Sequence, residues 1–90
     1  MNKSHIEKEF LERFIVLRKI VNGWNLIPGY PKDGFDTLNH KILSHLYKGA
    51  DFEKIKRVLE SDLTVIYGLT LESSDIERLT QDIITWWDLN

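Results

Sequence analysis

Apolar residues recur at steps of three and four positions through four segments of this chain, and that spacing is the strongest constraint on its fold. A capping box, Ser4 with Glu7, predicts that a first helix starts near the N-terminus. Asn22-Gly23 supplies a left-handed stop for it. Its apolar stripe consists of Ile6, Phe10, Phe14, Leu17 and Val21, widened by Val16 and Ile20.

Two further helices are predicted between Asp36 and Gly68. Asp36 can cap the second helix, and Gly49 ends it. Asp51 opens the third helix, for which Gly68 is the natural stop. The apolar positions of the second helix are Leu38, Ile42 and Leu46, and those of the third are Phe52, Ile55, Leu59, Leu63 and Ile66.

The stretch 62–71, DLTVIYGLTL, combines helix periodicity with residue types that favour strands. We predict helix to about Tyr67, because the apolar register of the third helix continues without a break. A short hairpin that turns at Gly68 is the alternative. A lone hairpin with no other strand to pair with would be only marginally stable.

Ser74 and Glu77 form a second capping box, which predicts a fourth helix that runs nearly to the end of the chain. Its inner face comprises Ile76, Leu79 and Ile83, and then either Trp86 or Trp87, with the other tryptophan half exposed. The fold class expected is therefore all-α. We predict a single compact four-helix domain over residues 1–90, with one long structured loop between the first two helices.

The composition suits one ordinary globular domain. Of the 90 residues, 42% are hydrophobic and 29% charged, and the net charge of −2 argues against a protein held on nucleic acid by bulk positive charge. The absence of cysteine excludes disulfides and thiolate chemistry. No signal peptide or membrane-spanning segment is evident, so we expect a complete, cytoplasmic protein.

Charge is divided unevenly along the chain. Residues 1–50 carry eight Lys or Arg and five Asp or Glu, whereas residues 51–90 carry four and nine. The C-terminal part therefore has a net charge of −5. Such an acidic segment can steer a basic protein to its surface, or it can simply keep the domain in solution.

The stretch 22–34, NGWNLIPGYPKDG, is the one long segment without helix periodicity. Pro28-Gly29 fits the centre of a type II turn, which makes the loop stiff. We expect at least one of Trp24 and Ile27 to fold back over the open end of the bundle. Tyr30 at the tip is the better candidate for an exposed aromatic anchor, because a rigid ring loses little entropy when a partner covers it.

No constellation predicts catalysis, and we expect no enzyme activity, cofactor or metal. His40 and His45 are five positions apart, so they point away from each other on one helix. Asp36 and His40 share a face at four positions and are the foremost pair for the alternative of a small enzyme. A nucleic-acid regulator is the other alternative, with a helix-turn-helix around 48–50 and phosphate contacts from Lys54, Lys56 and Arg57.

The C-terminal half resembles the colicin-nuclease immunity proteins. The resemblance rests on D62-L63-T64-V65-I66-Y67, then S74-D75-I76-E77, and an apolar helix that ends in Trp86. Members of that family are small acidic four-helix domains with an Asp-Leu-Ile-Tyr-Tyr-Pro segment, a later Ser-Pro and a last helix ending in Trp. The small immunity proteins of contact-dependent inhibition systems are similar in kind.

The resemblance implies tight inhibition of a bacterial toxin by masking it with acidic and tyrosine side chains. Only Asp62 and Tyr67 match the family motif. Their acidic neighbours Glu60, Glu72 and Asp75 join the predicted binding residues because of their charge alone. We therefore predict a protein-binding inhibitor of a basic toxin, with nucleic acid and membrane unlikely partners. The residues predicted to bind the partner are Trp24, Tyr30, Glu60, Asp62, Tyr67, Glu72 and Asp75.

Overall fold

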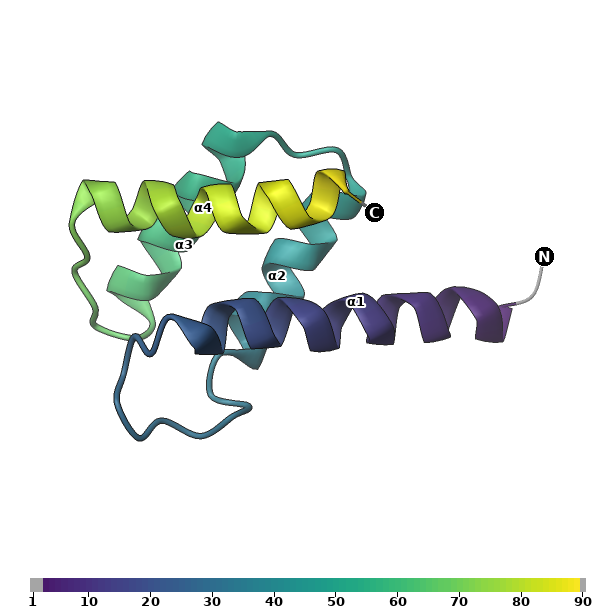
Figure 1. The fold of residues 1–90 in the computed structure, drawn as a ribbon, viewed down its shortest axis with the longest axis horizontal. Coiled ribbons are helices and arrows are strands. Elements are labelled where there is room, and N and C mark those ends of the chain that lie inside the picture. Colours follow the sequence, from purple (N-terminus) through teal and green to yellow (C-terminus); the bar gives the residue numbers. More distant parts are fainter. Residues whose placement is uncertain (1–2, 90) are drawn as a thin grey trace.

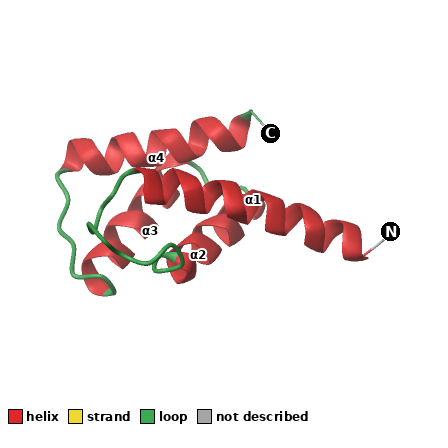
Figure 2. Cartoon of the chain, turned by 60° about the horizontal axis from the view of Figure 1, so that its bottom comes forward, coloured by secondary structure: helices red, strands yellow, loops and turns green. Residues whose placement is uncertain are grey.

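The computed structural model describes residues 3–89, with side chains described from Glu7 onward. Four helices follow one another, and no strand occurs in this part of the chain (Figures 1 and 2). Their bounds are α1 Lys3–Gly23, α2 Asp36–Tyr47, α3 Phe52–Val65 and α4 Ser73–Asp88. The all-α, four-helix prediction is confirmed, and the hairpin alternative for 62–71 is wrong.

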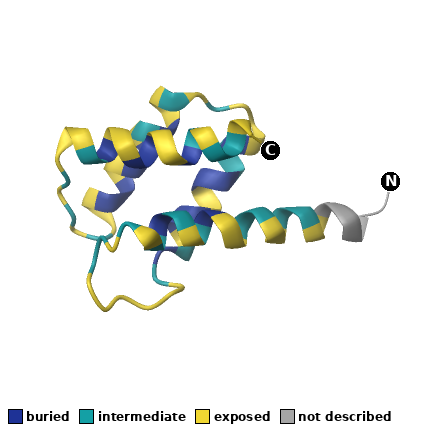
Figure 3. Ribbon diagram, viewed as in Figure 1, coloured by how far each residue is buried: buried dark blue, intermediate teal, exposed yellow. Residues whose placement is uncertain are grey.

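The helices contact one another in a closed order: α1 packs on α2, α2 on α3, α3 on α4, and α4 on α1. Their inward faces form one core, shown dark blue in Figure 3. The N-terminal end of α1 extends beyond the other three helices (Figure 1). The core consists of Leu17, Val21, Phe35, Leu38, Ile42, Leu43, Leu46, Ile55, Val58, Leu59, Leu63, Ile76, Leu79 and Ile83.

The first turn of α2 differs from the prediction that Asp36 caps it. Phe35 occupies the capping position and makes no side-chain hydrogen bond to the helix, while Asp36 is the first helical residue. The Asp36 carboxylate instead accepts two hydrogen bonds from the guanidinium of Arg18 on α1, with Nε to Oδ1 at 2.9 Å. The charged guanidinium of Arg18 is a stronger donor than a backbone amide, and it holds the Asp36 carboxylate against α1.

The other predicted caps have mixed outcomes. Asp51 caps α3 as predicted, because its Oδ1 accepts from the backbone N–H of Lys54 at 2.9 Å. The Ser74 cap is wrong: α4 begins one residue earlier, since the carbonyl of Glu72 already accepts from the N–H of Ile76. The Ser4 capping box lies outside the described side chains.

The third helix ends at Val65 rather than near Tyr67. Val65 and Ile66 are 79% and 53% exposed, so the predicted inward position of Ile66 is also wrong. The chain leaves the helix at this point because Gly68 takes a left-handed φ of 68°, and the N–H of Leu69 then donates to the carbonyl of Leu63 at 2.8 Å. Trp86 and Trp87 are both half-buried, whereas one was predicted to pack and the other to be half exposed.

Residues 24–35 connect α1 to α2. The N–H of Tyr30 donates to the carbonyl of Ile27 at 3.0 Å, and Gly29 has a φ of 78°, as a type II turn requires. Asn22 closes the base of the connection by donating from Nδ2 to the carbonyl of Lys32 at 2.9 Å. Trp24 and Ile27 pack against the core, as predicted.

The core contains one side-chain amide whose burial costs free energy that no hydrogen bond offsets. Asn39 on α2 is fully buried, and neither its Nδ2 nor its Oδ1 has a hydrogen-bond partner among the described residues. Burying an unpaired amide costs about 1–3 kcal/mol. By contrast, the buried Thr80 is satisfied, because its hydroxyl donates to the carbonyl of Ile76 at 2.7 Å.

We expect Asn39→Leu to raise the free energy of unfolding by about 1–2 kcal/mol, because leucine has a similar size and no polar atoms to desolvate. Urea unfolding followed by circular dichroism measures the change. Asn22→Leu is the matched control, and its lost hydrogen bond should lower stability by about 1 kcal/mol. A destabilised Asn39→Leu protein would show that the buried amide is in fact satisfied.

Candidate protein-binding surfaces

Tyr30 and Tyr67, two of the residues predicted to bind a partner, lie together in one aromatic cluster. Phe35 lies between them, with ring centroids 5.0 Å from Tyr30 and 4.8 Å from Tyr67, and the two tyrosine rings are 6.2 Å apart, edge to face. Tyr30 is 39% exposed. Its ring lies over Gly34, where an added Cβ would come within 2.1 Å of Tyr30 Cε2. We call Tyr30, Phe35 and Tyr67 the tyrosine cluster.

Tyr67 also has a structural role. Burial raises the pKa of its hydroxyl, and a hydrogen bond with the backbone of Leu38 opposes that rise. A bond that favours the phenolate must come from a donor, so the Leu38 N–H donates to the Tyr67 oxygen. Leu38 is the third residue of α2, where backbone N–H groups have no partner within the helix. Tyr67 therefore stabilises the start of α2, where Phe35 supplies no cap.

Asp62 is not at the surface. It is only 6% exposed, and the Nζ of Lys41 on α2 lies 3.2 Å from both carboxylate oxygens. The Lys41 side chain is half exposed, so a buried carboxylate is paired with a cation that remains in contact with water. The Asp62 carboxylate consequently joins α3 to α2 through its ion pair with Lys41.

The other acidic residues of the predicted set lie on or next to α3 and α4. Glu60 and Glu72 are exposed, and Asp75 is partly buried. The two helices pack side by side, and Lys56 on α3 lies 3.4 Å from the carboxylate of Glu77 on α4. Exposed carboxylates therefore occur on both of the helices that this ion pair joins. The exposed acidic residues of the C-terminal part are Asp51, Glu53, Glu60, Glu72, Glu77, Asp82 and Asp88.

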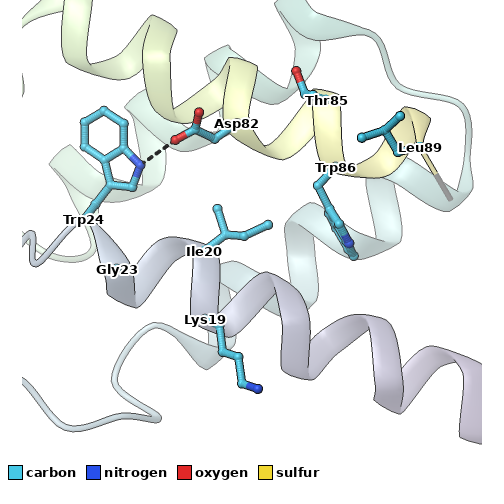
Figure 4. Close-up of a pocket in the computed structure, with 8 residues that line it drawn as sticks. All are labelled: Lys19, Ile20, Gly23, Trp24, Asp82, Thr85, Trp86 and Leu89. Carbon is cyan, nitrogen blue, oxygen red and sulfur yellow. Dashed lines mark hydrogen bonds between the residues drawn. The ribbon is translucent and has the colours of Figure 1, made fainter.

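Trp24 lies on a different face, in a hollow of about 650 Å³ between α1 and α4 (Figure 4). Its indole Nε1 donates to Asp82 Oδ2 at 2.9 Å, which ties the end of α1 to the middle of α4. Ile20 projects from α1 toward α4, and Trp86 projects from α4 toward α1 (Figure 4). The hollow is lined by Lys19, Ile20, Gly23, Trp24, Asp82, Thr85, Trp86 and Leu89.

A second hollow, of about 330 Å³, continues along α1 and is also lined by Trp86. Its other lining residues are Glu9, Glu12, Arg13 and Val16. Both hollows border Trp86, and their lining residues on α1 follow one another at helical spacing from Glu9 to Gly23, so we call the two hollows together the α1–α4 groove. Only Trp24 of this groove belongs to the predicted binding residues.

The far end of the bundle is closed by rings and one cation. The rings of Tyr47 and Trp87 are 5.1 Å apart, and Phe10 stacks on Tyr47 at 5.7 Å. The guanidinium of Arg13 lies over Trp87 at 4.9 Å and donates to the Tyr47 hydroxyl at 3.2 Å. These contacts hold Arg13 in place beside the α1–α4 groove.

The alternatives raised by the sequence find little geometric support. Asp36 is bound by Arg18, while the exposed His40 ring lies against Phe10 at 5.6 Å, so the pair does not form a catalytic couple. Within residues 3–89 no three metal-binding side chains gather at one place. None of the helices in the described part of the chain combines the length and the apolar character needed to cross a bilayer.

Lys54 and Arg57, three positions apart, share a side of α3, whereas Lys56 is directed toward α4. Lys56 pairs with Glu77, whereas Lys54 lies near His45, on the side where α3 faces α2. The short turn between α2 and α3 that the alternative requires is present, at residues 48–51.

No protein-family model, curated protein or solved structure matches this chain. The resemblance to immunity proteins therefore stays a hypothesis, and the argument for function rests on the surfaces described above.

The sequence pattern missed the α1–α4 groove, although a signal was present. Val16 and Ile20 widen the apolar stripe of α1, and we predicted them as part of an inward face. Val16 is in fact 38% exposed, because α4 contacts only one part of α1. An apolar stripe that is wider than the area the neighbouring helices can cover predicts such a groove.

Replacing Tyr67 by Phe should lower the free energy of unfolding by about 1 kcal/mol, because the N–H of Leu38 would lose its acceptor. Tyr30→Phe removes an exposed hydroxyl from the same cluster and should leave stability within about 0.5 kcal/mol of wild type. Thermal unfolding of the two variants makes the comparison. Equal effects would contradict a capping role for Tyr67.

Folding stability should fall as the pH drops, through His45. Burial lowers the pKa of His45 below its ordinary 6.5, and Lys54, Lys48 and Lys41 lower it further, while Asp62 opposes them. The unfolded chain then takes up the proton more readily than the folded chain does. The contribution of neutral His45 to folding stability is therefore fully present above about pH 6.5 and is lost as the pH falls below it.

Unfolding free energies of wild type and His45→Gln, measured between about pH 7.5 and 5.5, test this assignment. The variant should show a flatter dependence than wild type. Parallel curves would assign the pH dependence to other groups.

Proposed function

We propose that this protein binds another protein and neutralises it, most concretely as an immunity or antitoxin-like inhibitor of a basic bacterial toxin. The observation that carries the proposal is the set of exposed carboxylates on α3, on α4 and just before α4, among them Glu60, Glu72 and Glu77. Lys56, which lies between the two helices, is already paired with Glu77. Exposed carboxylates in residues 51–89 outnumber the exposed cations Lys54, Arg57 and Arg78, so this part of the chain is suited to a cationic partner.

Inhibition of this kind needs no catalytic group on the inhibitor. Long-range attraction between opposite charges raises the rate of association, and a few rigid, apolar side chains then hold the complex. The tyrosine cluster supplies such a side chain in Tyr30, whose ring is supported from below by Phe35. Val65 and Ile66, next to Tyr67 in the chain, add exposed apolar area.

The nucleic-acid alternative is favoured by one observation, the short turn between α2 and α3. It requires that exposed cations on α3, chiefly Lys54 and Arg57, contact phosphates next to an acidic α4. Binding to a duplex would then be weak and steeply dependent on salt. A gel-shift titration with random-sequence duplex at two salt concentrations distinguishes this alternative from protein binding.

We expect the immobilised protein to capture one basic protein from lysate of its native host, in about equimolar amount. Expressed alone, that protein should arrest growth, and co-expression of this chain should restore it. Glu60→Gln with Glu72→Gln should slow association severalfold at low salt and have little effect at high salt. Association rates measured by surface plasmon resonance report the change.

The matched control is Glu7→Gln with Asp33→Asn, which removes two exposed charges from the N-terminal half. It should associate at nearly the wild-type rate. Capture of an acidic protein, or a captured protein whose toxicity is unaffected by this chain, would overturn the proposed function.

A further inference from the structure

The α1–α4 groove is an open hollow that exposes apolar side chains of α1 and of the C-terminal part of the chain. It follows α1 from Glu9 to Gly23, which corresponds to about 21 Å of helix axis, or about four turns. The opposite wall is shorter and runs from Asp82 to Leu89, and along this part the two walls can accept a third helix whose side chains pack between theirs.

The floor of the groove is apolar and incompletely covered. Val16 and Leu89 are 38% and 82% exposed, and Ile20, Trp24 and Trp86 are half-buried. Exposed apolar surface of this kind, rimmed by polar residues, is typical of protein interaction sites. The two tryptophans present large, rigid faces, which are the side chains most often found at the centre of an interface.

The rim carries two carboxylates that no described cation neutralises. Glu9 is paired with Arg13 at 2.8 Å, and Arg13 is held further by Tyr47 and Trp87, so this pair contributes little net charge. Glu12, on the α1 wall, is exposed and has no described ion pair.

Asp82 stands on the opposite wall, on α4, and is bonded only to the neutral indole of Trp24. The one other cation on the rim, Lys19, points away from α4 in Figure 4. Glu12 and the Trp24–Asp82 contact are therefore separated by about 18 Å, or about three turns of α1.

We propose that the α1–α4 groove binds a cationic amphipathic helix of the partner protein. Apolar side chains on one face of that helix contact Val16, Ile20 and the two tryptophans, and basic side chains about three turns apart meet Glu12 and Asp82. The inference deepens the proposed function and rests on it for the presence of a protein partner. It assigns the chemistry of the segment that the groove recognises.

A synthetic peptide tests the groove without the natural partner. The probe is a helical peptide of about 15 residues with leucines on one face and two lysines about three turns apart. A scrambled peptide of the same composition is the comparison. Binding is measured by calorimetry and by the fluorescence of Trp24 and Trp86, and the ordered peptide should bind at least about tenfold more tightly than the scrambled one.

Glu12→Gln with Asp82→Asn should weaken binding by about tenfold at low salt. Asparagine at position 82 retains an oxygen for the indole of Trp24, so the fold is preserved, and circular dichroism checks it. The matched control is Glu7→Gln with Asp88→Asn, which removes exposed charges from the same two helices outside the groove. It should bind the peptide like wild type.

A second pair of variants tests the floor. Val16→Ser with Leu89→Ser should weaken binding by about tenfold, whereas Leu11→Ser, at a 60% exposed position of α1 outside the groove, should not. Equal affinity for the two peptides, or equal loss in matched and control variants, would overturn the assignment. A dimer in sedimentation that Val16→Ser dissociates would also overturn it, since a second copy would then fill the groove.

Failure of this inference and failure of the proposed function are separable. A captured toxin whose affinity is unchanged by the groove variants would overturn the groove assignment and leave the inhibitor proposal standing. Selective peptide binding by a chain that captures no basic protein would support the groove and overturn the inhibitor proposal.

Discussion

The first turn of α2 is the junction on which the rest of this bundle depends. Arg18 ties it to α1 through Asp36, Tyr67 ties it to the chain beyond α3 through the N–H of Leu38, and Phe35 anchors the 24–35 connection beneath it. These contacts meet at a helix end that has no side-chain cap of its own. The orientation of three separate segments is therefore fixed by groups that would otherwise remain unsatisfied.

The order and type of the elements could be predicted from the sequence, because apolar periodicity is a local property of each helix. Cap positions were less predictable. Asp51 caps α3 and makes no ion pair with a described residue, whereas Asp36 has Arg18 opposite it from a different helix. A capping residue can be recognised from the local sequence. A partner from another helix can nevertheless bind its side chain in place of the backbone N–H that it would cap. The end of α3 was misjudged for a similar reason, since the Leu63–Leu69 hydrogen bond forms only after the chain has turned.

The candidate surfaces could be predicted only in part. An exposed Tyr30 was foreseeable from the stiff turn around it, but its contact with Tyr67 depends on how the two connections pack. Asp62 was predicted to face a partner, yet Lys41 and the α2–α3 contact bury it. The α1–α4 groove exists because α1 carries more apolar surface than α4 covers. Its two walls come from opposite ends of the chain, so the wide apolar stripe of α1 could indicate an uncovered surface but not which segment forms the opposite wall.

The contact of Tyr30 with Gly34 has an evolutionary consequence. Any side chain at position 34 would occupy the space that the Tyr30 ring fills, and would push the ring away from Phe35. The two positions are thus constrained as a pair. Among descendants of this sequence, an aromatic residue at 30 and a glycine at 34 should be kept or lost together, and lineages that lose both should have abandoned this loop as a recognition element.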